Sequence, residues 1–331
     1  MEIVRFLRDV PEKLKGAALA IGNFDGVHRG HQTVLGEAIA IAKREGRRSG
    51  AVVFEPHPRE FFAPETPFFR LTPLPVKLEL LEALGLDQTF VIAFDSELAA
   101  LSADAFATEV VAKGLGASHV IVGHDFSYGK GRTGTSEELA VLGRELGFGV
   151  DVVAPVSEGG ATFSSSRIRE HLRQGEVREA AGQLGYWWRV RGQVGAGAGR
   201  GKGLGFPTLN LPLAPGQDVR HGIYAMRVDH GGGRHHAAGY VGIRPTFGAG
   251  EPPVLEAYLL DFTGDLYGKE VDVELIEFLR PDATFATPEA LAAQMRGDTD
   301  RARAVLAKID ASDPIARFPL AHALAKPAPA L

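Results

Sequence analysis

One short stretch, GNFDGVHRGH at residues 22–31, most constrains what this chain can fold into. It follows an apolar run at residues 17–21 and precedes a helical pattern that starts near Gly30. An apolar strand, a glycine-rich turn and a helix, in this order, are typical of phosphate sites in α/β sheets. The turn lets the backbone approach a ligand, and the helix N-terminus offers free N–H groups. The stretch therefore predicts an anion-binding turn.

Two histidines in this stretch are the first candidate catalytic residues. His28 and His31 are three residues apart, so they share one face of the first helical turn. There, two imidazoles can donate hydrogen bonds to phosphate oxygens where negative charge develops during attack on phosphorus. A bare His-x-x-His would more often be a pair of surface residues or of metal ligands. The strand–turn–helix context favours the phosphate role.

Size, charge and composition limit the classes of protein. The chain has 331 residues, enough for two domains, and its net charge of −5 gives no electrostatic reason to expect nucleic acid or an anionic membrane as a partner. No apolar run approaches the roughly 20 residues needed to span a bilayer, and no secretory signal is indicated. The absence of cysteine excludes disulfides and thiolate catalysis. We expect a cytoplasmic enzyme that acts on small molecules, as a monomer or weak homo-oligomer.

Up to about residue 184, short apolar runs alternate with helical patterns. The runs lie at 17–21, 51–54, 88–93, 119–122 and 150–153, and the helical patterns at 31–46, 75–84, 103–113, 136–146 and 165–183. This alternation predicts a Rossmann-like parallel sheet with helices on both faces. Ligands of such sheets bind outside the carboxyl ends of the strands, so site residues are expected in the loops after the runs.

Near residue 185 the pattern changes to short strands without helices between them, at 187–194, 207–211, 222–228, 236–243, 254–261 and 271–279. Such a series is typical of an antiparallel β-barrel. A helical pattern follows at 287–309, with Thr287 as its cap and Pro288 in the first turn. The sequence thus predicts an α/β domain at 1–184, a barrel with its helix at 185–311, and a tail at 312–331 that carries no chemistry.

Two loops after the apolar runs could contact a planar ring or a nucleotide. Phe61 and Phe62 follow the second run, where they either flank such a ring or pack beneath the loop. The loop at 123–134 carries a formal G-x-G-x-x-G, but these glycines do not directly follow the strand, so a dinucleotide-binding fingerprint is not indicated. A flexible basic loop next to a nucleotide is the interpretation that we favour.

A third loop contains the serines 164–166, beside Arg167 and Arg169. Capping of the following helix would explain the serines, but it would not require the two arginines. Hydroxyls, free N–H groups and arginine at one helix start indicate a second anion site.

The barrel half has candidate residues of its own. The glycine-rich loop at 195–205 can wrap a phosphate through backbone N–H groups, although it is no Walker A motif. Thr208 and Asn210 are two residues apart, so on a strand they face the same side. Their hydroxyl and amide oxygens can help to hold Mg²⁺ on ATP phosphates. Glu256 lies among apolar neighbours, where a carboxylate either faces solvent or serves as a base.

These motifs resemble those of one enzyme family. GNFDGVHRGHQ, at residues 22–32, resembles the opening motif of bacterial bifunctional riboflavin kinase/FAD synthetases, and its His-x-Gly-His part resembles the loop of the nucleotidyltransferase superfamily. In this chain Tyr128 replaces a usual phenylalanine, Ser166 a threonine and Tyr240 an asparagine. Further matches follow in the family's order at 123–129, 163–169, 202–210, 242–247 and 256–268.

The resemblance implies that ATP phosphorylates riboflavin to FMN in the barrel, and that the α/β domain adenylylates FMN to FAD with release of pyrophosphate. It implies ATP, Mg²⁺, riboflavin, FMN and FAD as ligands, and the catalytic residues His28, His31, Arg169 and Glu256. The metal would be held by Thr208 and Asn210. The expected nucleotide- and flavin-binding residues are Gly22, Asn23, Phe24, Asp25, Gly26, Phe62, Asp125, Phe126, Tyr128, Arg132, Ser164, Ser165, Ser166, Gly203, Gly205, Pro207, Thr208, Asn210 and Arg244.

Two alternatives stay open. Tyr240 and the altered glycine loop would also fit an FMN adenylyltransferase whose barrel has lost kinase activity. The second alternative belongs to a different class, a flavin-binding module without turnover. Four residues argue against it, because binding alone requires none of them: His28, His31, Asn210 and Glu256.

Overall fold

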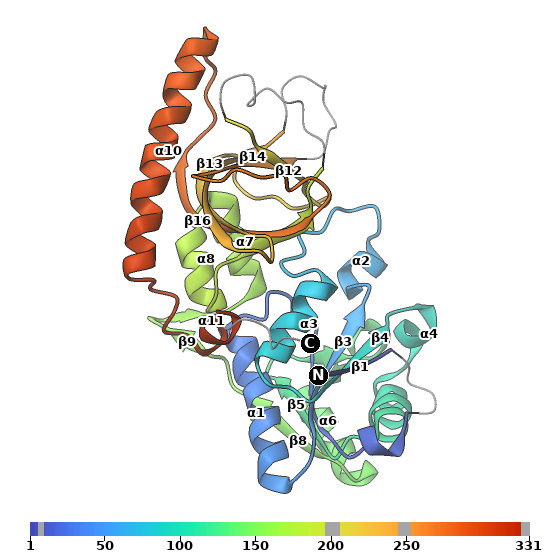
Figure 1. Cartoon of the computed structure of the whole chain (residues 1–331). Coiled ribbons are helices and arrows are strands. Elements are labelled where there is room, and N and C mark those ends of the chain that lie inside the picture. Colours follow the sequence, from blue (N-terminus) through green and yellow to red (C-terminus); the bar gives the residue numbers. More distant parts are fainter. Residues whose placement is uncertain (6–9, 196–205, 244–252, 326–331) are drawn as a thin grey trace. The chain divides into compact units, whose positions relative to one another are not determined.

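The computed structural model describes residues 1–5, 10–195, 206–243 and 253–325, and the chain divides into two compact units (Figure 1). The first unit comprises Met1–Ser165 with a short segment that begins at Ala323, and the second comprises Ser166–His322. The helices between residues 165 and 184 therefore group with the second unit, although the sequence pattern places them in the α/β domain. The predicted boundary at 184–185 stays a prediction.

A six-stranded parallel sheet forms the centre of the first unit, in the order β1-β4-β3-β2-β5-β8. This confirms the predicted Rossmann-like sheet. The edge strand β1 lies outside the predicted runs, because its three residues are too few to show a pattern. The strands are β1 (Glu2–Val4), β2 (Ala18–Ile21), β3 (Ser49–Glu55), β4 (Gln88–Ala93), β5 (His119–Gly123) and β8 (Gly149–Val153). Two small hairpins pair β6 (Ser127–Tyr128) with β7 (Gly134–Thr135) and β9 (Ser157–Glu158) with β10 (Ala161–Thr162).

Helices connect these strands, as the alternating pattern predicts. Their bounds are α1 (Arg29–Glu45), α2 (Pro58–Phe62), α3 (Leu74–Ala83), α4 (Ser96–Ala100), α5 (Ala103–Ala105) and α6 (Ser136–Leu146). The chain continues from α5 into wider π-type turns, η2 (Phe106–Leu115), and single 3₁₀ turns form η1 (Glu12–Leu14) and η3 (Lys130–Arg132).

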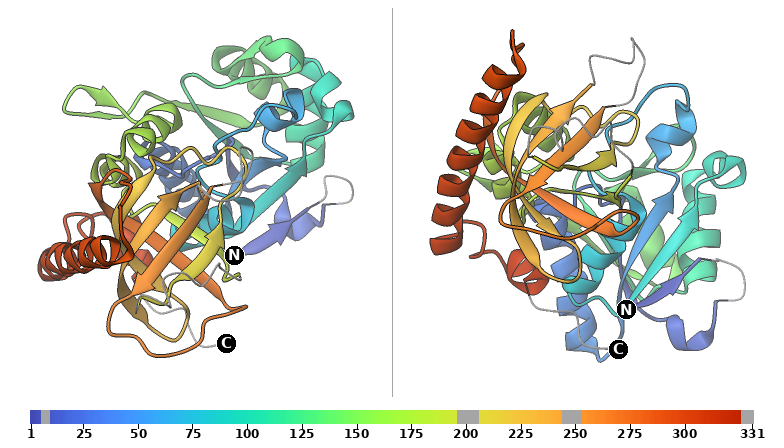
Figure 2. Two further views of the ribbon diagram at one scale, coloured as in Figure 1. Left: turned by 90° about the horizontal axis from the view of Figure 1, so that it is seen from above. Right: turned by 45° about the horizontal axis from the view of Figure 1, so that its top comes forward.

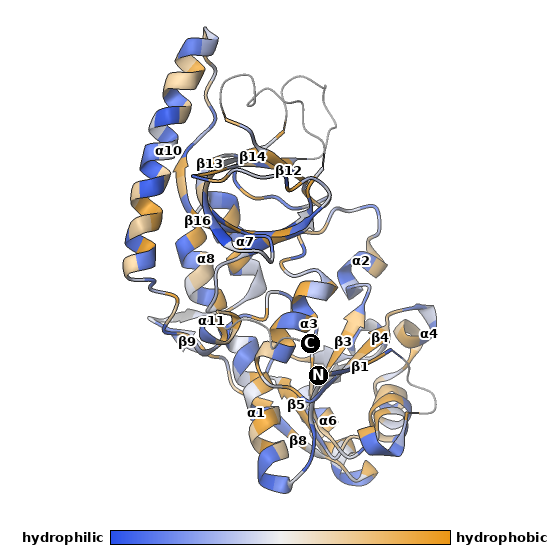
Figure 3. Cartoon of the chain, in the orientation of Figure 1, coloured by the Kyte–Doolittle hydropathy of each residue, from blue (hydrophilic) through white to orange (hydrophobic). Residues whose placement is uncertain are grey.

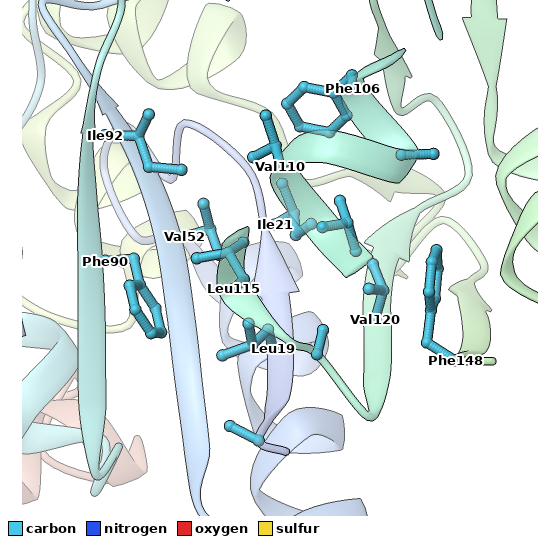
Figure 4. Close-up of a cluster of buried hydrophobic side chains, with 14 of the residues drawn as sticks. Leu19, Ile21, Val52, Phe90, Ile92, Phe106, Val110, Leu115, Val120 and Phe148 are labelled. Atoms are coloured by element: carbon cyan, nitrogen blue, oxygen red, sulfur yellow. The ribbon is translucent and has the colours of Figure 1, made fainter. Parts of the chain in front are cut away.

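Apolar side chains on the central strands hold the sheet in place. All residues of β2 are buried, as expected for a parallel strand that is covered on both faces. Leu19 and Ile21 lie in a cluster with Val52, Phe90 and Val110 (Figure 4). Because β2 is fixed by this packing, the loop that follows it starts from a rigid position, and the first candidate site is built on that loop.

The second unit contains the predicted barrel. Its antiparallel strands run in the order β11-β16-β13-β14-β15-β12, and a bridge between Gly195 and Asn210 links the two end strands, so the barrel is nearly closed (Figure 2). The strands are β11 (Arg189–Gln193), β12 (Leu209–Pro212), β13 (Gly222–Asp229), β14 (Arg234–Gly242), β15 (Val254–Leu259) and β16 (Glu270–Arg280). The unit begins at Ser166, the second residue of α7 (Ser165–Gln174), and continues with α8 (Val177–Leu184).

A long helix, α10 (Pro288–Ala311), follows the barrel and contacts β13, β14 and β16. The Oγ1 atom of Thr287 accepts a hydrogen bond from the Ala290 N–H at 3.2 Å, which confirms Thr287 as the cap. Hydrophobic and hydrophilic residues alternate along α10 (Figure 3), as expected for a helix with one packed face. Within the described residues, we find no helix whose length and apolar character would let it cross a bilayer.

The segment after Ala311 is packed against the barrel rather than loosely attached. The Trp187 indole N–H donates to both carboxylate oxygens of Asp313, at 3.2 and 3.0 Å. Arg227, which is buried, donates to Asp313 Oδ2 at 3.3 Å and to Glu274 Oε2 at 2.9 Å. Further along, Ile315, Phe318 and Leu320 are buried, the last of them in α11 (Pro319–Leu324). Part of the predicted tail is thus a component of the second unit's core.

Replacing Asp313 by alanine should lower the free energy of unfolding by about 2–3 kcal/mol, because it leaves a buried guanidinium and an indole N–H short of their acceptor. Asp310 offers a matched control, since its pair with His236 is half exposed. Asp310→Ala should cost at most about 1 kcal/mol. Urea denaturation of the two variants measures both values, and equal losses would mean that the Asp313 network contributes no more than a surface pair.

Candidate active sites

The loop after β2 leads directly into α1, and His28 caps the helix. The backbone N–H of His31 donates to His28 Nδ1 at 3.2 Å. Because Nδ1 is the acceptor, a neutral His28 ring carries its proton on Nε2. The loop bends sharply before this cap, with positive φ angles of 46° at Phe24 and 41° at Val27, which non-glycine residues adopt rarely. The local sequence therefore builds a constrained turn that fixes one tautomer of His28.

The two histidines of the motif lie against each other. Their rings stack with centroids 3.6 Å apart, and the ring of Phe24 meets His31 edge-on at 5.4 Å. Burial lowers the pKa of His31 well below its usual value, and the positive charges of His28 and Lys77 lower it further. Nδ1 of His31 is buried and has no hydrogen-bond partner among the residues that the structure describes. At neutral pH we therefore expect His31 to be uncharged.

Asp25 builds the loop from inside. Its side chain is buried, and its carboxylate accepts hydrogen bonds from the backbone N–H groups of Leu71 at 3.2 Å and Thr72 at 3.1 Å. Gly26 N–H donates to Thr72 Oγ1 at 2.9 Å. These bonds join the loop to the segment before α3. The carboxylate of Asp25 therefore stabilises the loop, and its predicted role in binding a ligand stays a prediction.

Asn23 occupies the start of the same loop. Its Oδ1 atom is buried without a hydrogen-bond partner among the described residues, and its carbonyl oxygen accepts from Lys77 Nζ at 2.7 Å. Lys77 and Thr72 were missed by the sequence analysis. A signal for Lys77 does exist, since it shares the apolar stripe of its helix with Leu81, four residues on.

Of the three serines at 164–166, Ser165 has a hydrogen bond to the loop after β2. Ser165 Oγ donates to the Asp25 carbonyl oxygen at 2.8 Å, so residues far apart in the sequence meet here. Ser164 precedes it in the first unit, whereas Ser166 and the buried Arg169 group with the second unit. Their part in this site therefore stays a prediction.

A second constellation lies on three neighbouring strands of the barrel. Asn210 on β12 pairs with Glu256 on β15, and Glu256 pairs in turn with Tyr240 on β14. Residues directly opposite each other across a ladder project to the same face, so these side chains are neighbours. Asn210 Nδ2 donates to the Thr208 carbonyl oxygen at 3.2 Å. Tyr240 Oη lies 3.2 Å from Asp282 Oδ2, and burial followed by the charge of Asp282 raises the pKa of the phenol.

Comparison with known proteins shows which family each half of the chain resembles. A family model for FAD synthetase matches residues 10–167, and one for riboflavin kinase matches residues 184–306. A bifunctional riboflavin kinase/FMN adenylyltransferase from Pseudomonas fluorescens is 36% identical over 307 residues, which cover 93% of this chain and 98% of that protein. The chain belongs to the bifunctional riboflavin kinase/FMN adenylyltransferase family. A member from Escherichia coli K12 is 36% identical over 310 residues, covering 92% and 97% of the two chains.

The fold of this chain is also similar to that of a solved structure. It superposes with a TM-score of 0.81 at 27% identity, and covers 91% of this chain and 98% of the other. That structure is described as a macrolide-efflux protein from Streptococcus pneumoniae. That description applies to the other protein, and what the two chains share here is the fold.

The aromatic residues that the family resemblance assigns to the flavin have different surroundings. The side chain of Phe62 is 68% exposed and meets Phe61 and Phe94 edge-on at 5.2 and 5.7 Å. Tyr128 is instead buried, with its ring stacked on Phe126 at 5.5 Å, and burial raises its pKa to about 12. In this structure the Tyr128 ring lies in the hydrophobic core of the first unit, and its predicted contact with a flavin stays a prediction.

The structure describes some of the remaining predicted binding residues and leaves the others outside the described ranges. Asp125 and Arg132 are exposed, and Arg132 Nε donates to Ser127 Oγ at 2.7 Å. Pro207 is exposed and Thr208 is half-buried. Gly203, Gly205 and Arg244, with most of the glycine-rich loop, lie outside the described residues.

Proposed function

We infer that this chain makes FAD from riboflavin in two ATP-dependent steps. The observation that carries the inference is that FAD synthetase and riboflavin kinase models match separate stretches of one chain. The relatives that the chain covers over 97–98% of their length have both activities in their names. In the first step riboflavin and ATP give FMN and ADP. In the second step FMN and another ATP give FAD and pyrophosphate.

The adenylyl transfer is assigned to the loop after β2. A phosphate oxygen of FMN attacks the α-phosphorus of ATP, and the bond to the β-phosphate breaks as pyrophosphate leaves. Nε2–H of His28 would donate to the α-phosphate oxygens as their charge grows, beside the N-terminus of α1. His31 would assist, while Arg169 and Ser164 to Ser166 would hold the departing phosphates. No covalent enzyme intermediate is needed, because positioning and electrostatics supply the catalysis.

The phosphorylation of riboflavin is assigned to the barrel. Glu256 would take the proton from the 5′-hydroxyl of riboflavin, whose oxygen attacks the γ-phosphorus of ATP in line. The register that places Glu256 beside Asn210 supports this role, because it puts a carboxylate next to the strand that would hold ATP.

The donors present fit Mg²⁺. A hydroxyl on Thr208 and an amide oxygen on Asn210 belong to the oxygen ligands that this ion prefers. Asn210 lies in β12, and Thr208 immediately precedes that strand instead of belonging to it as the predicted strand 207–211 implied. Bound there with ATP, Mg²⁺ would neutralise phosphate charge. Gly203, Gly205, Pro207 and Arg244 are proposed to bind the nucleotide or the flavin in the same half of the chain.

In the α/β unit, the backbone of Gly22, Asn23, Phe24 and Gly26 is proposed to approach the nucleotide, with Asp125, Phe126 and Arg132 nearby. Phe62 is proposed as the flavin contact, which its exposed ring supports. A cytoplasmic location and a monomeric or weakly oligomeric state stay predictions.

One chromatographic experiment tests the two steps together. The full chain is incubated with riboflavin, ATP and Mg²⁺, and riboflavin, FMN and FAD are separated over time. FMN should rise first and FAD should follow. FAD formed from supplied FMN, without FMN from riboflavin, would leave only the adenylyltransferase. Binding of flavin without either product would indicate a module without turnover.

A further inference from the structure

One buried cation near the first site has no part in the chemistry described so far. Lys77 on α3 is 2% exposed and lies among the buried residues Val76, Leu78 and Leu81. Lysine is almost never fully buried unless it is paired. Within the described residues, the only hydrogen bond of its ammonium group is the one to the Asn23 carbonyl oxygen, at 2.7 Å.

The charge of this ammonium group is only partly balanced. A carbonyl oxygen uses one of its three N–H donors and carries no negative charge. Among the negative charges, Asp25 has the largest effect on Lys77. Its carboxylate also accepts hydrogen bonds from two backbone N–H groups, those of Leu71 and Thr72. Glu55 and Glu60 have smaller effects on Lys77, and both are paired with Arg70, whose positive charge opposes them. Burial accordingly lowers the pKa of Lys77. An anion arriving at the loop would supply the missing charge.

The bond to Asn23 acts on the loop where it turns. Asn23 immediately precedes Phe24, whose φ of 46° is unfavourable for a bulky residue, so something must hold this turn in place. Thr72 holds the next part of the loop through Gly26, and Asp25 holds it through Leu71 and Thr72. One segment, residues 71–77, therefore holds the loop at three residues, Asn23, Asp25 and Gly26.

We propose that Lys77 is a positioning residue for adenylyl transfer: its buried ammonium group holds the Asn23 carbonyl from behind, so that the loop presents His28 and His31 to the phosphates of ATP. The inference rests on the function proposed for this loop. It adds a cation that touches neither reacting group but fixes the residues that do.

The pKa of His31 distinguishes this role of Lys77 from a purely structural one, because it responds to the charge of Lys77. Within the described part of the chain, two charged or titratable groups act on His31, His28 at the cap of α1 and Lys77 on α3, and the Lys77 charge is one cause of its lowered pKa. Removing a nearby positive charge favours the protonated imidazole. The pKa of His31 should therefore rise in Lys77→Met and stay close to that of the natural protein in Lys77→Arg, which keeps the charge.

The test compares the full-length natural protein with Lys77→Met, Lys77→Arg and the control Lys43→Met, an exposed lysine on α1. FAD formation from FMN and ATP should fall about 10²-fold in kcat for Lys77→Met, the cost of a loop misplaced by about 1 Å. Lys77→Arg should recover part of this loss. Phosphorylation of riboflavin should be unchanged in all variants, and nuclear magnetic resonance should show the rise in the His31 pKa only in Lys77→Met.

The outcomes separate the inference from the function that it rests on. If the natural protein forms no FAD, the proposed function is wrong. If it forms FAD and Lys77→Met keeps both its rate and the His31 titration, the role of Lys77 is refuted. If Lys77→Met does not fold, the proposal is tested on the natural protein instead. The pKa of the Lys77 ammonium group, measured from its ¹⁵N resonance, must then rise when ATP binds. An unchanged value overturns the proposal.

Discussion

Replacing His28 by alanine is expected to slow the formation of FAD from FMN about 10²–10³-fold, the usual cost of losing one donor to a developing oxyanion. The His31 N–H bond to Nδ1 leaves Nε2–H as the donor of a neutral His28. Riboflavin phosphorylation should continue, because that step is assigned to the barrel. Supplying each flavin separately and measuring the initial rate of each product gives the two activities independently.

His28 also caps α1, so its removal has a structural cost of about 1 kcal/mol that must be separated from chemistry. Asparagine is a good capping residue but lacks an imidazole. His28→Asn should therefore keep the thermal stability of the natural protein and still lose most FAD formation. Loss of both activities together in a folded variant would contradict the assignment of two separate sites.

Local signals predicted the strand, turn and helix around His28 and His31 well. The strand, the turn and the helix that follows it are adjacent in sequence, so the apolar run of β2 and the spacing of His28 and His31 specified the turn without knowledge of distant contacts. The parallel sheet was equally accessible, because strands buried on both faces appear as continuous apolar runs.

Contacts between distant segments were not predictable in the same way. Lys77 and Thr72 reach the loop from residues about which the motif says nothing, and only the folded chain brings them to Asn23 and Gly26. The burial of Tyr128 is a similar case. The sequence of a short hairpin does not show how deeply its aromatic residue is buried, and the contacts of Tyr128 with Phe126 and Phe106 become visible only in the folded chain.

The packing of the tail is another feature that the sequence left open. Its prolines predicted a segment without chemistry, which stays a prediction, and the structure adds that Asp313 meets Arg227 and Trp187 in the second unit. A single carboxylate has no periodic pattern, so its partners become visible only when the barrel and the end of α10 are in place.

Replacing Glu256 by glutamine is expected to reduce the phosphorylation of riboflavin by about 10²–10⁴-fold, the contribution typical of a general base. Glutamine keeps the size and polarity of the side chain, so the packing beside Asn210 and Tyr240 should persist. Adenylylation of supplied FMN should proceed at the natural rate, which would show that the variant is folded. Accumulation of FMN from riboflavin and ATP is the quantity to measure.

Glu270 provides the matched control, since it is an exposed glutamate on β16 of the same barrel. Glu270→Gln removes the same charge from the same unit and should leave both rates within about twofold of those of the natural protein, because surface substitutions away from a site have small effects. If Glu256→Gln phosphorylated riboflavin as fast as this control, the carboxylate beside Asn210 would not be the base. The proton of the 5′-hydroxyl would then have to leave without it, and the register of β12, β15 and β14 would serve ATP binding alone.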